Sequence, residues 1–452
     1  MKENNFPYKW WALIGLSLLS FTAFVDVTII TTALPFIQKE LHATVLQLQW
    51  VMTIFAMILC MFMIIAGKSG DLLGRKKVFY FGFIIFGIAA IGAANSHSIQ
   101  MLIFFRAIQG FAAAIIATIG VALLPQAFPA NEQMRAIGVY SAFNGAGLAL
   151  GPFLGGVLIT TLGWRWVFWI NIPIILIGLG CCSFSLKPSP KPDYNIKIDW
   201  YGAILLAIGL GSLIYGIVHG EQMGWDLAST WVAIAGGLSA LVLLIILENK
   251  IEQPLLDLAI FKNRHACLAM LVCVIAGFIV FVFMFFDSLY LQLMRQQSAF
   301  YIGLTLLCVP VSQVFVSLFL EKLVNKFGVF NLLVYGLGIA LLAAICHAFF
   351  YPNTSIFFII LILVLMGYTW GISNAGSITA LTQSVPSEKM GSAIGTLFTI
   401  LNVSGSISLA LATVLFHWRE SHSNFISAFH WVALFSAAIM LIIFVVGLRL
   451  RK

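Results

Sequence analysis

Apolar residues occur along this chain in long runs, and short polar segments separate each run from the next. A helix needs about 20 mostly apolar residues to cross a bilayer, and roughly fourteen runs approach or exceed that length. The pattern therefore predicts transmembrane helices at residues 11–36, 46–66, 78–95, 100–123, 136–161, 166–186, 200–219, 229–248, 267–292, 300–320, 329–350, 355–379, 391–416 and 429–448. An even number of crossings places both ends of the chain on the same side of the membrane.

The composition supports the same interpretation. Hydrophobic residues make up 61% of the 452 residues and charged residues only 9%, whereas a soluble protein carries roughly 25% charged residues. So few charges cannot cover a water-soluble surface, so we predict an all-α polytopic membrane protein. The first apolar run is far longer than the about 7–15 apolar residues of a signal peptide, and no small-residue cleavage site follows it. We therefore expect it to remain as the first helix.

The net charge of +8 would suggest a nucleic-acid partner in a soluble chain. In a membrane protein, basic residues are needed to keep loops on the cytoplasmic side. If the N-terminus is cytoplasmic, few of the 24 lysines and arginines fall in outside loops, namely Lys39, Arg165, Arg295 and Arg419. This asymmetry predicts cytoplasmic termini, a location in the cytoplasmic (inner) membrane and no nucleic-acid partner.

Two pairs of similar segments indicate that the chain contains a duplicated unit. QAFPANEQMRAIG (126–138) and QSVPSEKMGSAIG (383–395) align without a gap. A weaker similarity relates GKSGDLLGRKK (67–77) to EKLVNKFG (321–328) at nearly the same offset. Parallel repeats are a recurring plan of transporters, which bind substrate between the two halves. We predict a six-helix bundle, a linker with two extra transmembrane helices and a second six-helix bundle, at residues 1–186, 187–266 and 267–452.

Three ionisable side chains, those of Asp26, Arg106 and Asp287, lie inside predicted helices. A charge in mid-membrane costs about 2.5–3.5 kcal/mol on insertion scales, so each should face the protein interior or a water-filled cavity. Asp26 lies roughly 15 Å and Arg106 roughly 9 Å from the outer ends of their helices, so the two side chains can meet. Burial favours the protonated form of Asp26 and a nearby arginine favours the ionised form, which suits a proton carrier. The alternative is a permanent pair that only locks two helices together.

Asp287 lies roughly 6 Å from the outer end of its helix by the same rise per residue. It is therefore either a second titrating or cation-attracting site or an interfacial residue that reaches water.

Glycines mark two segments that bear on conformational change. GLALGPFLGG contains Gly147, Gly151, Pro152, Gly155 and Gly156. Its glycines allow another helix to pack closely, and its proline removes a backbone hydrogen bond. The corresponding part of the second repeat has no such motif, which favours a specialised bend or hinge, with tight packing as the simpler role.

The segment GKSGDLLGRKK joins two predicted helices on the cytoplasmic side. Gly67 and Gly74 are expected to allow a tight turn there, and Asp71 and Arg75 to pair with each other or cap helix ends. The alternative is a plain basic loop that only sets the topology.

Polar and aromatic residues in other helices are candidates for lining a substrate cavity, although most such groups only hydrogen-bond between helices. They are Gln109, Tyr140, Asn144, Gln313, Trp370, Asn374 and Asn402. The chain has no P-loop and no segment long enough for a nucleotidase domain, which excludes transport driven by ATP. Its seven cysteines form no CxxC pair and indicate neither a disulfide framework nor a metal site. We find no arrangement typical of an enzyme and expect no catalytic residues.

Several segments resemble the major facilitator superfamily, and specifically its fourteen-helix drug:proton antiporter branch, the EmrB/QacA-like exporters. VDVTIITTALP (25–35) is similar to the first-helix motif LDxTIVNVALP, with Thr31 where asparagine is usual. LIFFRAIQGFAAA (102–114) is similar to the fourth-helix motif, whose arginine takes part in proton coupling and is Arg106 here. GLALGPFLGG resembles the fifth-helix motif of antiporters, which is associated with exporters. GKSGDLLGRKK resembles the loop motif GxLxDRxGRK, which helps to latch one conformation, but Leu72 replaces an arginine of its charge network.

The resemblance extends over nearly the whole chain and includes the stretches 199–220 and 288–304. It implies two six-helix major-facilitator bundles plus two inserted central helices. It also implies a secondary active exporter that exchanges external protons for lipophilic or cationic drug-like compounds by rocking its two halves.

The expected partners are a small-molecule substrate, protons as the coupling ion and the lipid bilayer, with no cofactor. We expect the chain to act as a monomer, and the sequence does not determine whether a periplasmic adaptor protein joins it. Two alternatives remain open. One is the same machine dedicated to a single metabolite, such as a siderophore or lipid-like product. The other is a membrane receptor or structural protein without transport.

Overall fold

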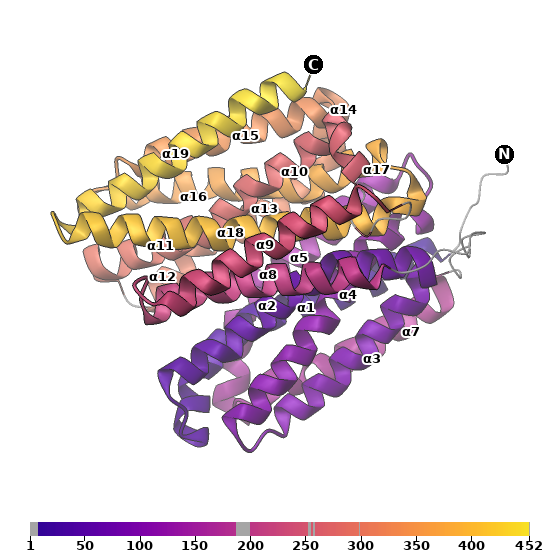
Figure 1. The fold of residues 1–452 in the computed structure, drawn as a ribbon, viewed down its shortest axis with the longest axis horizontal. Coiled ribbons are helices and arrows are strands. Elements are labelled where there is room, and N and C mark those ends of the chain that lie inside the picture. Colours follow the sequence, from indigo (N-terminus) through magenta and orange to yellow (C-terminus); the bar gives the residue numbers. More distant parts are fainter. Residues whose placement is uncertain (1–7, 187–198, 252–254, 256–257, 298, 452) are drawn as a thin grey trace. The chain divides into compact units, whose positions relative to one another are not determined.

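The computed structural model describes residues 8–186, 199–251, 255, 258–297 and 299–451. The regular elements in this part of the chain are all helices (Figure 1). Among the described residues, 14 helices are long and apolar enough to cross a membrane, which confirms the predicted all-α polytopic fold. The start of the predicted linker, residues 187–198, lies outside the described residues.

Residue contacts divide the chain into two compact units. The first comprises Met1–Tyr215, Ala235–Asp257 and Pro386–Thr396, and the second comprises the remaining residues. The division into three parts predicted above concerns duplication of the sequence rather than packing, and it stays a prediction.

Most of the N-terminal helices begin and end close to the predicted bounds, but the second continues past residue 66 to Leu73. The N-terminal helices are α1 (Lys9–Leu41), α2 (Val45–Leu73), α3 (Arg75–Ala94), α4 (Ile99–Ala127), α5 (Gln133–Leu162), α6 (Trp166–Trp169) and α7 (Asn171–Ser185), followed by α8 (Trp200–Met223) and α9 (Ala228–Glu248). The helix predicted at 166–186 is divided at Ile170 into α6 and α7. Because α1 continues through Pro35 to Leu41, it is longer than predicted.

The C-terminal spans are more often interrupted. Their elements are η1 (Leu258–Lys262), α10 (Arg264–Gly277), η2 (Phe278–Phe283), α11 (Met284–Leu289), η3 (Tyr290–Met294), α12 (Ala299–Leu306), α13 (Cys308–Leu318), α14 (Leu320–Phe327), α15 (Val329–His347), α16 (Ile356–Gly371), η4 (Ile372–Gly376), α17 (Ser377–Ser384), η5 (Ser387–Lys389), α18 (Met390–Glu420) and α19 (Phe425–Leu450). Three of the interruptions, η2, η3 and η4, are π-helical turns within otherwise continuous spans. Such turns occur frequently at functional sites.

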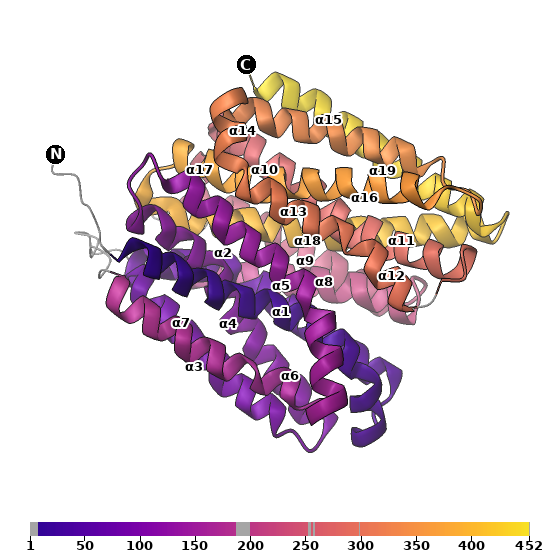
Figure 2. The ribbon, with the colours of Figure 1, turned by 180° about the vertical axis from the view of Figure 1, so that it is seen from behind.

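The core of the first unit forms around α1 and α4. Helix α1 packs along α5 and α7 and also contacts α4 (Figure 2). Helix α4 is the most deeply buried of the candidate spans, because 83% of its apolar 18-residue stretch lies inside the protein. Small side chains at Gly110, Ala112, Ala113 and Ala114 let neighbouring helices approach it closely. This packing brings the middles of α1 and α4 together.

Two glycines at corresponding places support the weaker of the two sequence similarities. Gly74 lies between α2 and α3 with φ +94°, and Gly328 lies between α14 and α15 with φ +76°. Glycine adopts positive φ at little cost because it has no Cβ. The same turn chemistry therefore recurs at the offset that the sequence suggested.

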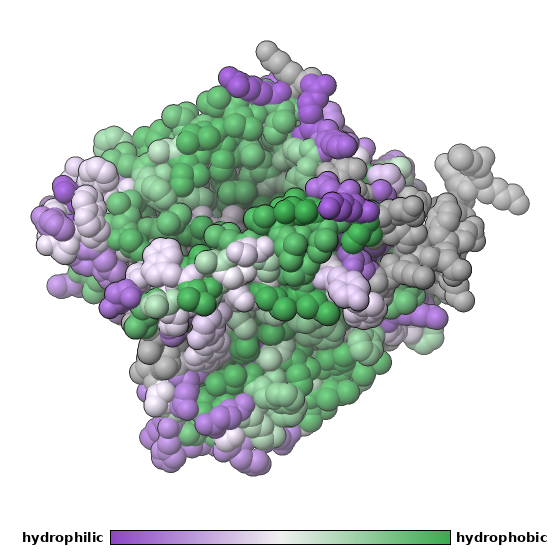
Figure 3. Space-filling view, viewed as in Figure 1, coloured by the Kyte–Doolittle hydropathy of each residue, from purple (hydrophilic) through white to green (hydrophobic). Residues whose placement is uncertain are grey.

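Large apolar side chains are exposed along the helices. Phe184 is 85% exposed, Phe357 80% and Phe153 67%. Figure 3 shows hydrophobic residues over much of the face in view, with hydrophilic residues gathered toward the helix ends. This distribution is opposite to that of a water-soluble protein and fits a lipid-covered exterior.

Candidate functional site

The middle of the first unit contains a buried ion pair. Arg106 of α4 donates a hydrogen bond from Nη1 to Oδ2 of Asp26 on α1. Each side chain is only 1% exposed. The structure thus brings together two residues that the sequence predicts to lie at compatible depths along their helices.

Further polar groups complete the coordination of this pair. Oδ1 of Asp26 accepts hydrogen bonds from Nδ2 of Asn171 at 3.1 Å and from Nε2 of Gln109 at 3.5 Å. Arg106 also donates from Nη1 to Oε1 of Gln109 at 3.0 Å and from Nε to the carbonyl of Val51 at 3.2 Å. Both carboxylate oxygens of Asp26 therefore have partners, and the pair joins α1, α2, α4 and α7.

An aromatic ring covers the guanidinium group. The centre of the Phe55 ring lies 4.2 Å from the Cζ atom of Arg106, which is a cation–π contact. The backbone of α2 reaches this position because Gly110 of α4 has no side chain: a Cβ there would lie 2.5 Å from the carbonyl oxygen of Phe55. Removing one member of such a buried pair leaves an uncompensated charge, at a cost of about 3–5 kcal/mol.

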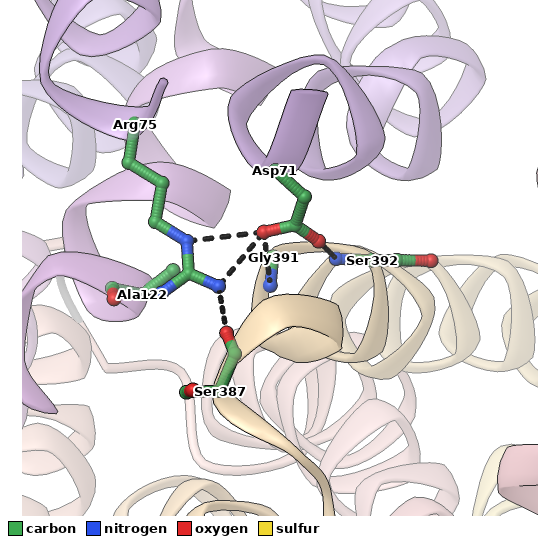
Figure 4. A network of polar contacts seen from close by, with 6 residues as sticks. All are labelled: Asp71, Arg75, Ala122, Ser387, Gly391 and Ser392. Atoms are coloured by element: carbon green, nitrogen blue, oxygen red, sulfur yellow. Dashed lines mark hydrogen bonds and ion pairs between the residues drawn. The ribbon is translucent and has the colours of Figure 1, made fainter. Parts of the chain in front are cut away.

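A second charged cluster lies at the end of α2, also within the first unit (Figure 4). Oδ1 of Asp71 accepts hydrogen bonds from Nε and Nη2 of Arg75, at 3.0 and 2.8 Å. The same carboxylate accepts hydrogen bonds from the backbone N–H groups of Gly391 at 3.1 Å and Ser392 at 3.0 Å. These N–H groups belong to the first turn of α18, where they have no partner within the helix. Asp71 therefore caps the N-terminus of α18 and compensates its partial positive charge.

Arg75 extends this cluster. It donates from Nη1 to the carbonyl of Ala122 at 3.0 Å and from Nη2 to the carbonyl of Ser387. The predicted pairing of Asp71 with Arg75 and the predicted capping role both occur. We name Asp71, Arg75 and the first turn of α18 the α2–α18 clasp.

The structure corrects the role expected for Gly67. This residue lies within α2 and not in a turn, and the turn itself is formed at Gly74. A Cβ on Gly67 would lie 2.1 Å from the carbonyl oxygen of Gly391, and a Cβ on Gly391 would lie 2.5 Å from that of Gly67. The two helices therefore cross with their backbones in contact, which places the carboxylate of Asp71 beside the first turn of α18.

The glycines of GLALGPFLGG lie along α5, and three of them face α1. A Cβ on Gly147 would lie 2.9 Å from the carbonyl oxygen of Phe21, and a Cβ on Gly151 only 1.9 Å from Oγ1 of Thr28. A Cβ on Gly155 would lie 2.2 Å from Oγ1 of Thr32. Helix α5 is continuous through the exposed Pro152. Tight packing against α1 thus accounts for this stripe, and the hinge role stays a prediction.

We expect Gly151→Ala to destabilise the protein and to lower its thermal unfolding midpoint, because the added methyl group has no room against Thr28 of α1. Gly156→Ala is the matched control, since nothing lies within 4 Å of a Cβ at that position of the same helix. The thermal unfolding midpoint of each purified variant in detergent checks this prediction. Equal midpoints for the two variants would contradict the tight contact.

In the second unit, Asp287 of α11 meets a histidine. Its Oδ2 lies 3.2 Å from Nε2 of His347, the last residue of α15, and the side chains are 2% and 0% exposed. Asp287 is therefore buried, although the sequence also allowed an interfacial position.

The candidate cavity residues fall in different surroundings. Gln109 belongs to the Asp26 cluster. Asn144 accepts a hydrogen bond from Ser20 at 2.6 Å, and Asn402 donates one to Phe398 of its own helix at 2.8 Å. The remaining residues are buried, namely Tyr140, Gln313, Trp370 and Asn374. Their predicted role in binding a substrate stays a prediction.

Asn171 and His347 are not among the site residues predicted from the sequence. Each is a polar residue at an end of a helical segment within an apolar run: Asn171 begins α7 and His347 ends α15. An inspection of every polar residue within the predicted spans would have found both. Their partners could not have been named, because Asp26 and Asp287 lie 145 and 60 residues away in the chain.

A model of the Major Facilitator Superfamily matches residues 16–409. The "Multidrug resistance protein Stp" of Mycobacterium tuberculosis (strain CDC 1551 / Oshkosh) is 28% identical over 420 residues, which cover 90% of this chain and 76% of that protein. The "Riboflavin transporter RibZ" of Clostridioides difficile (strain 630) is 28% identical over 414 residues, covering 90% and 88%. Among solved structures, the human organic anion transporter MFSD10 (TETRAN) has the same fold, with a TM-score of 0.68, 14% identity, and coverage of 99% of this chain and 100% of that chain.

Proposed function

The chain belongs to the major facilitator superfamily of membrane transporters, and on that basis we propose that it is a proton-coupled antiporter. It exports lipophilic, often cationic, drug-like compounds from the cytoplasm by alternating access. The observation that carries the coupling is the buried Asp26–Arg106 pair. Burying ionisable side chains inside a membrane costs free energy, so such residues are rare and usually have a function. The similarity to a multidrug resistance protein supports the substrate class.

Protonation of Asp26 is the step that couples the proton to conformational change. The neutral acid no longer compensates the charge of Arg106, so the contacts that join α1, α4 and α7 weaken. The return of the proton to water on the other side restores the ion pair. Substrate competes with the proton by binding better to the form in which Asp26 is ionised.

The α2–α18 clasp is the conformational latch in this proposal. Its two backbone hydrogen bonds hold the first turn of α18 against α2, and the ion pair with Arg75 stabilises the Asp71 carboxylate that accepts them. We place both termini in the cytoplasm, the chain in the cytoplasmic membrane, and the working form as a monomer.

A second candidate function is export or exchange of a single metabolite. The similarity to a riboflavin transporter over 90% of this chain favours this alternative. Such a carrier uses the same coupling pair but accepts a narrow range of ligands.

Two measurements on the purified protein and on inverted membrane vesicles test these proposals. An imposed pH gradient should drive the accumulation of a fluorescent lipophilic cation, and several unrelated cationic dyes should each raise the unfolding temperature. Stabilisation by one compound alone, such as riboflavin, would select the dedicated carrier. Accumulation that persists after the pH gradient is collapsed would contradict proton coupling.

A further inference from the structure

The contacts of His347 determine where its protons lie. Its Nδ1 atom is 2.8 Å from the carbonyl oxygen of Ala343, and a carbonyl oxygen can only accept a hydrogen bond. Nδ1 therefore carries a hydrogen, which leaves Nε2 to face Oδ2 of Asp287 at 3.2 Å. Two bare acceptors at this distance would repel each other, so one proton lies between Nε2 and Oδ2.

This proton has two possible positions, on the carboxyl group or on the imidazole. In both cases the pair has no net charge, and loss of the proton leaves one buried negative charge. The surroundings are aromatic: the ring of His347 lies 4.7 Å from that of Phe283 and 4.6 Å from that of Phe350. Oδ1 of Asp287 has no hydrogen-bond partner among the described residues. The negative form is thus poorly solvated in these aromatic surroundings.

The neighbouring ionisable groups have other partners. Tyr290 donates to the carbonyl of Tyr351 at 2.6 Å, and Arg295 donates to the carbonyl of Thr354. His430 of α19 lies 2.7 Å from the carbonyl oxygen of Phe350, and His417 of α18 lies 3.6 Å from Glu420 near the helix end. None of these four groups contacts the pair's proton through the interactions described, so the proton lies between Asp287 and His347 alone.

The contrast with the first unit is chemical. Asp26 faces an arginine, which keeps its proton at every physiological pH, and both of its oxygens have partners. Asp287 faces a histidine, whose neutral imidazole has one nitrogen that donates and one that accepts, so the proton between the two groups can lie on either of them. In addition, Asp287 lies in α11, between the π-helical turns η2 and η3. Such turns widen the helix locally and are frequent at functional sites.

We propose that the Asp287–His347 pair is a second proton-binding site, which binds and releases one exchangeable proton during the transport cycle. The proton moves from the Oδ2–Nε2 contact to water, and no other bond forms or breaks. Its part in transport rests on the proposed antiport, whereas the exchange of the proton does not.

Infrared difference spectra between acid and alkaline pH test the site directly. The full-length protein is used in detergent without substrate, over the range of pH in which it stays folded. Asp287→Asn preserves a hydrogen bond to His347, because the amide can donate to a neutral Nε2. His347→Gln identifies the bands of His347, and His430→Gln is the control histidine of the same unit.

We expect Asp287→Asn and His347→Gln each to abolish the same pH-dependent bands of the pair, which are carboxyl or imidazole bands according to where the proton lies, while His430→Gln retains them. In proteoliposomes, the number of protons exchanged per substrate should fall by about one in either variant, and by no more in the double variant, since the pair shares one proton. If Asp287→Asn leaves the pH-dependent bands of the pair unchanged, the inference is wrong. A protein that transports nothing would still give the spectra, so that outcome would contradict the antiport and not the proton site.

Discussion

Asp26→Asn is expected to abolish the accumulation of substrate driven by a pH gradient. The amide has nearly the shape of the carboxylate, so it keeps space filled between α1 and α4, but it carries no charge and binds no exchangeable proton. Uptake of a lipophilic cation into inverted vesicles should fall to the level measured without a gradient. Glu40→Gln is the matched control, because Glu40 is an acidic residue of the same helix whose side chain is half-exposed beside Arg165.

A loss of stability accompanies this substitution and must be separated from the loss of coupling. Arg106 becomes a buried charge without its carboxylate, which costs about 3–5 kcal/mol. The double variant Asp26→Asn/Arg106→Gln removes both charges and is expected to recover most of the lost stability without recovering coupled transport. If folded Asp26→Asn still accumulates substrate in response to pH, then Asp26 is structural. Coupling would then depend on another acid, with Asp287 as the first candidate.

The sequence predicts the helices of this protein well for a physical reason. Each span must satisfy its backbone polar groups with hydrogen bonds inside its own helix and expose apolar side chains to lipid, so its length and composition are visible without knowledge of its neighbours. The depth of a residue also follows from its position in a span, which is why Asp26 and Arg106 were expected at compatible levels. Both predictions concern single helices.

Contacts between distant segments are not visible in this way. The first turn of α18 lies against α2 across 320 residues of sequence, and only the structure shows that Gly67 serves this crossing. The same holds for Asn171, which reaches Asp26 from α7. Sequence alone shows a buried acid and a glycine-rich segment, but the partner depends on how the helices pack.

Asp71→Asn is expected to release the first turn of α18 and to reduce export. Two backbone amides and one guanidinium group share this carboxylate, and hydrogen bonds to a charged group contribute about 1.5–3 kcal/mol each. Losing the charge weakens all three, so the open form of the clasp should become roughly 10- to 100-fold more populated. Hydrogen–deuterium exchange of the peptide containing Gly391 and Ser392 measures this directly, beside the rate of pH-driven uptake.

Glu132→Gln is the control for this experiment. Glu132 forms an ion pair with Lys9 at 2.6 Å in the same unit, but its side chain is 32% exposed, so water compensates most of the loss. Unchanged exchange at residues 391–392 in Asp71→Asn would show that the carboxylate does not hold α18. Faster exchange with unchanged export would make the clasp a structural contact alone, because a latch must affect the rate at which the transporter changes conformation. Faster exchange together with slower export is the result that connects the two.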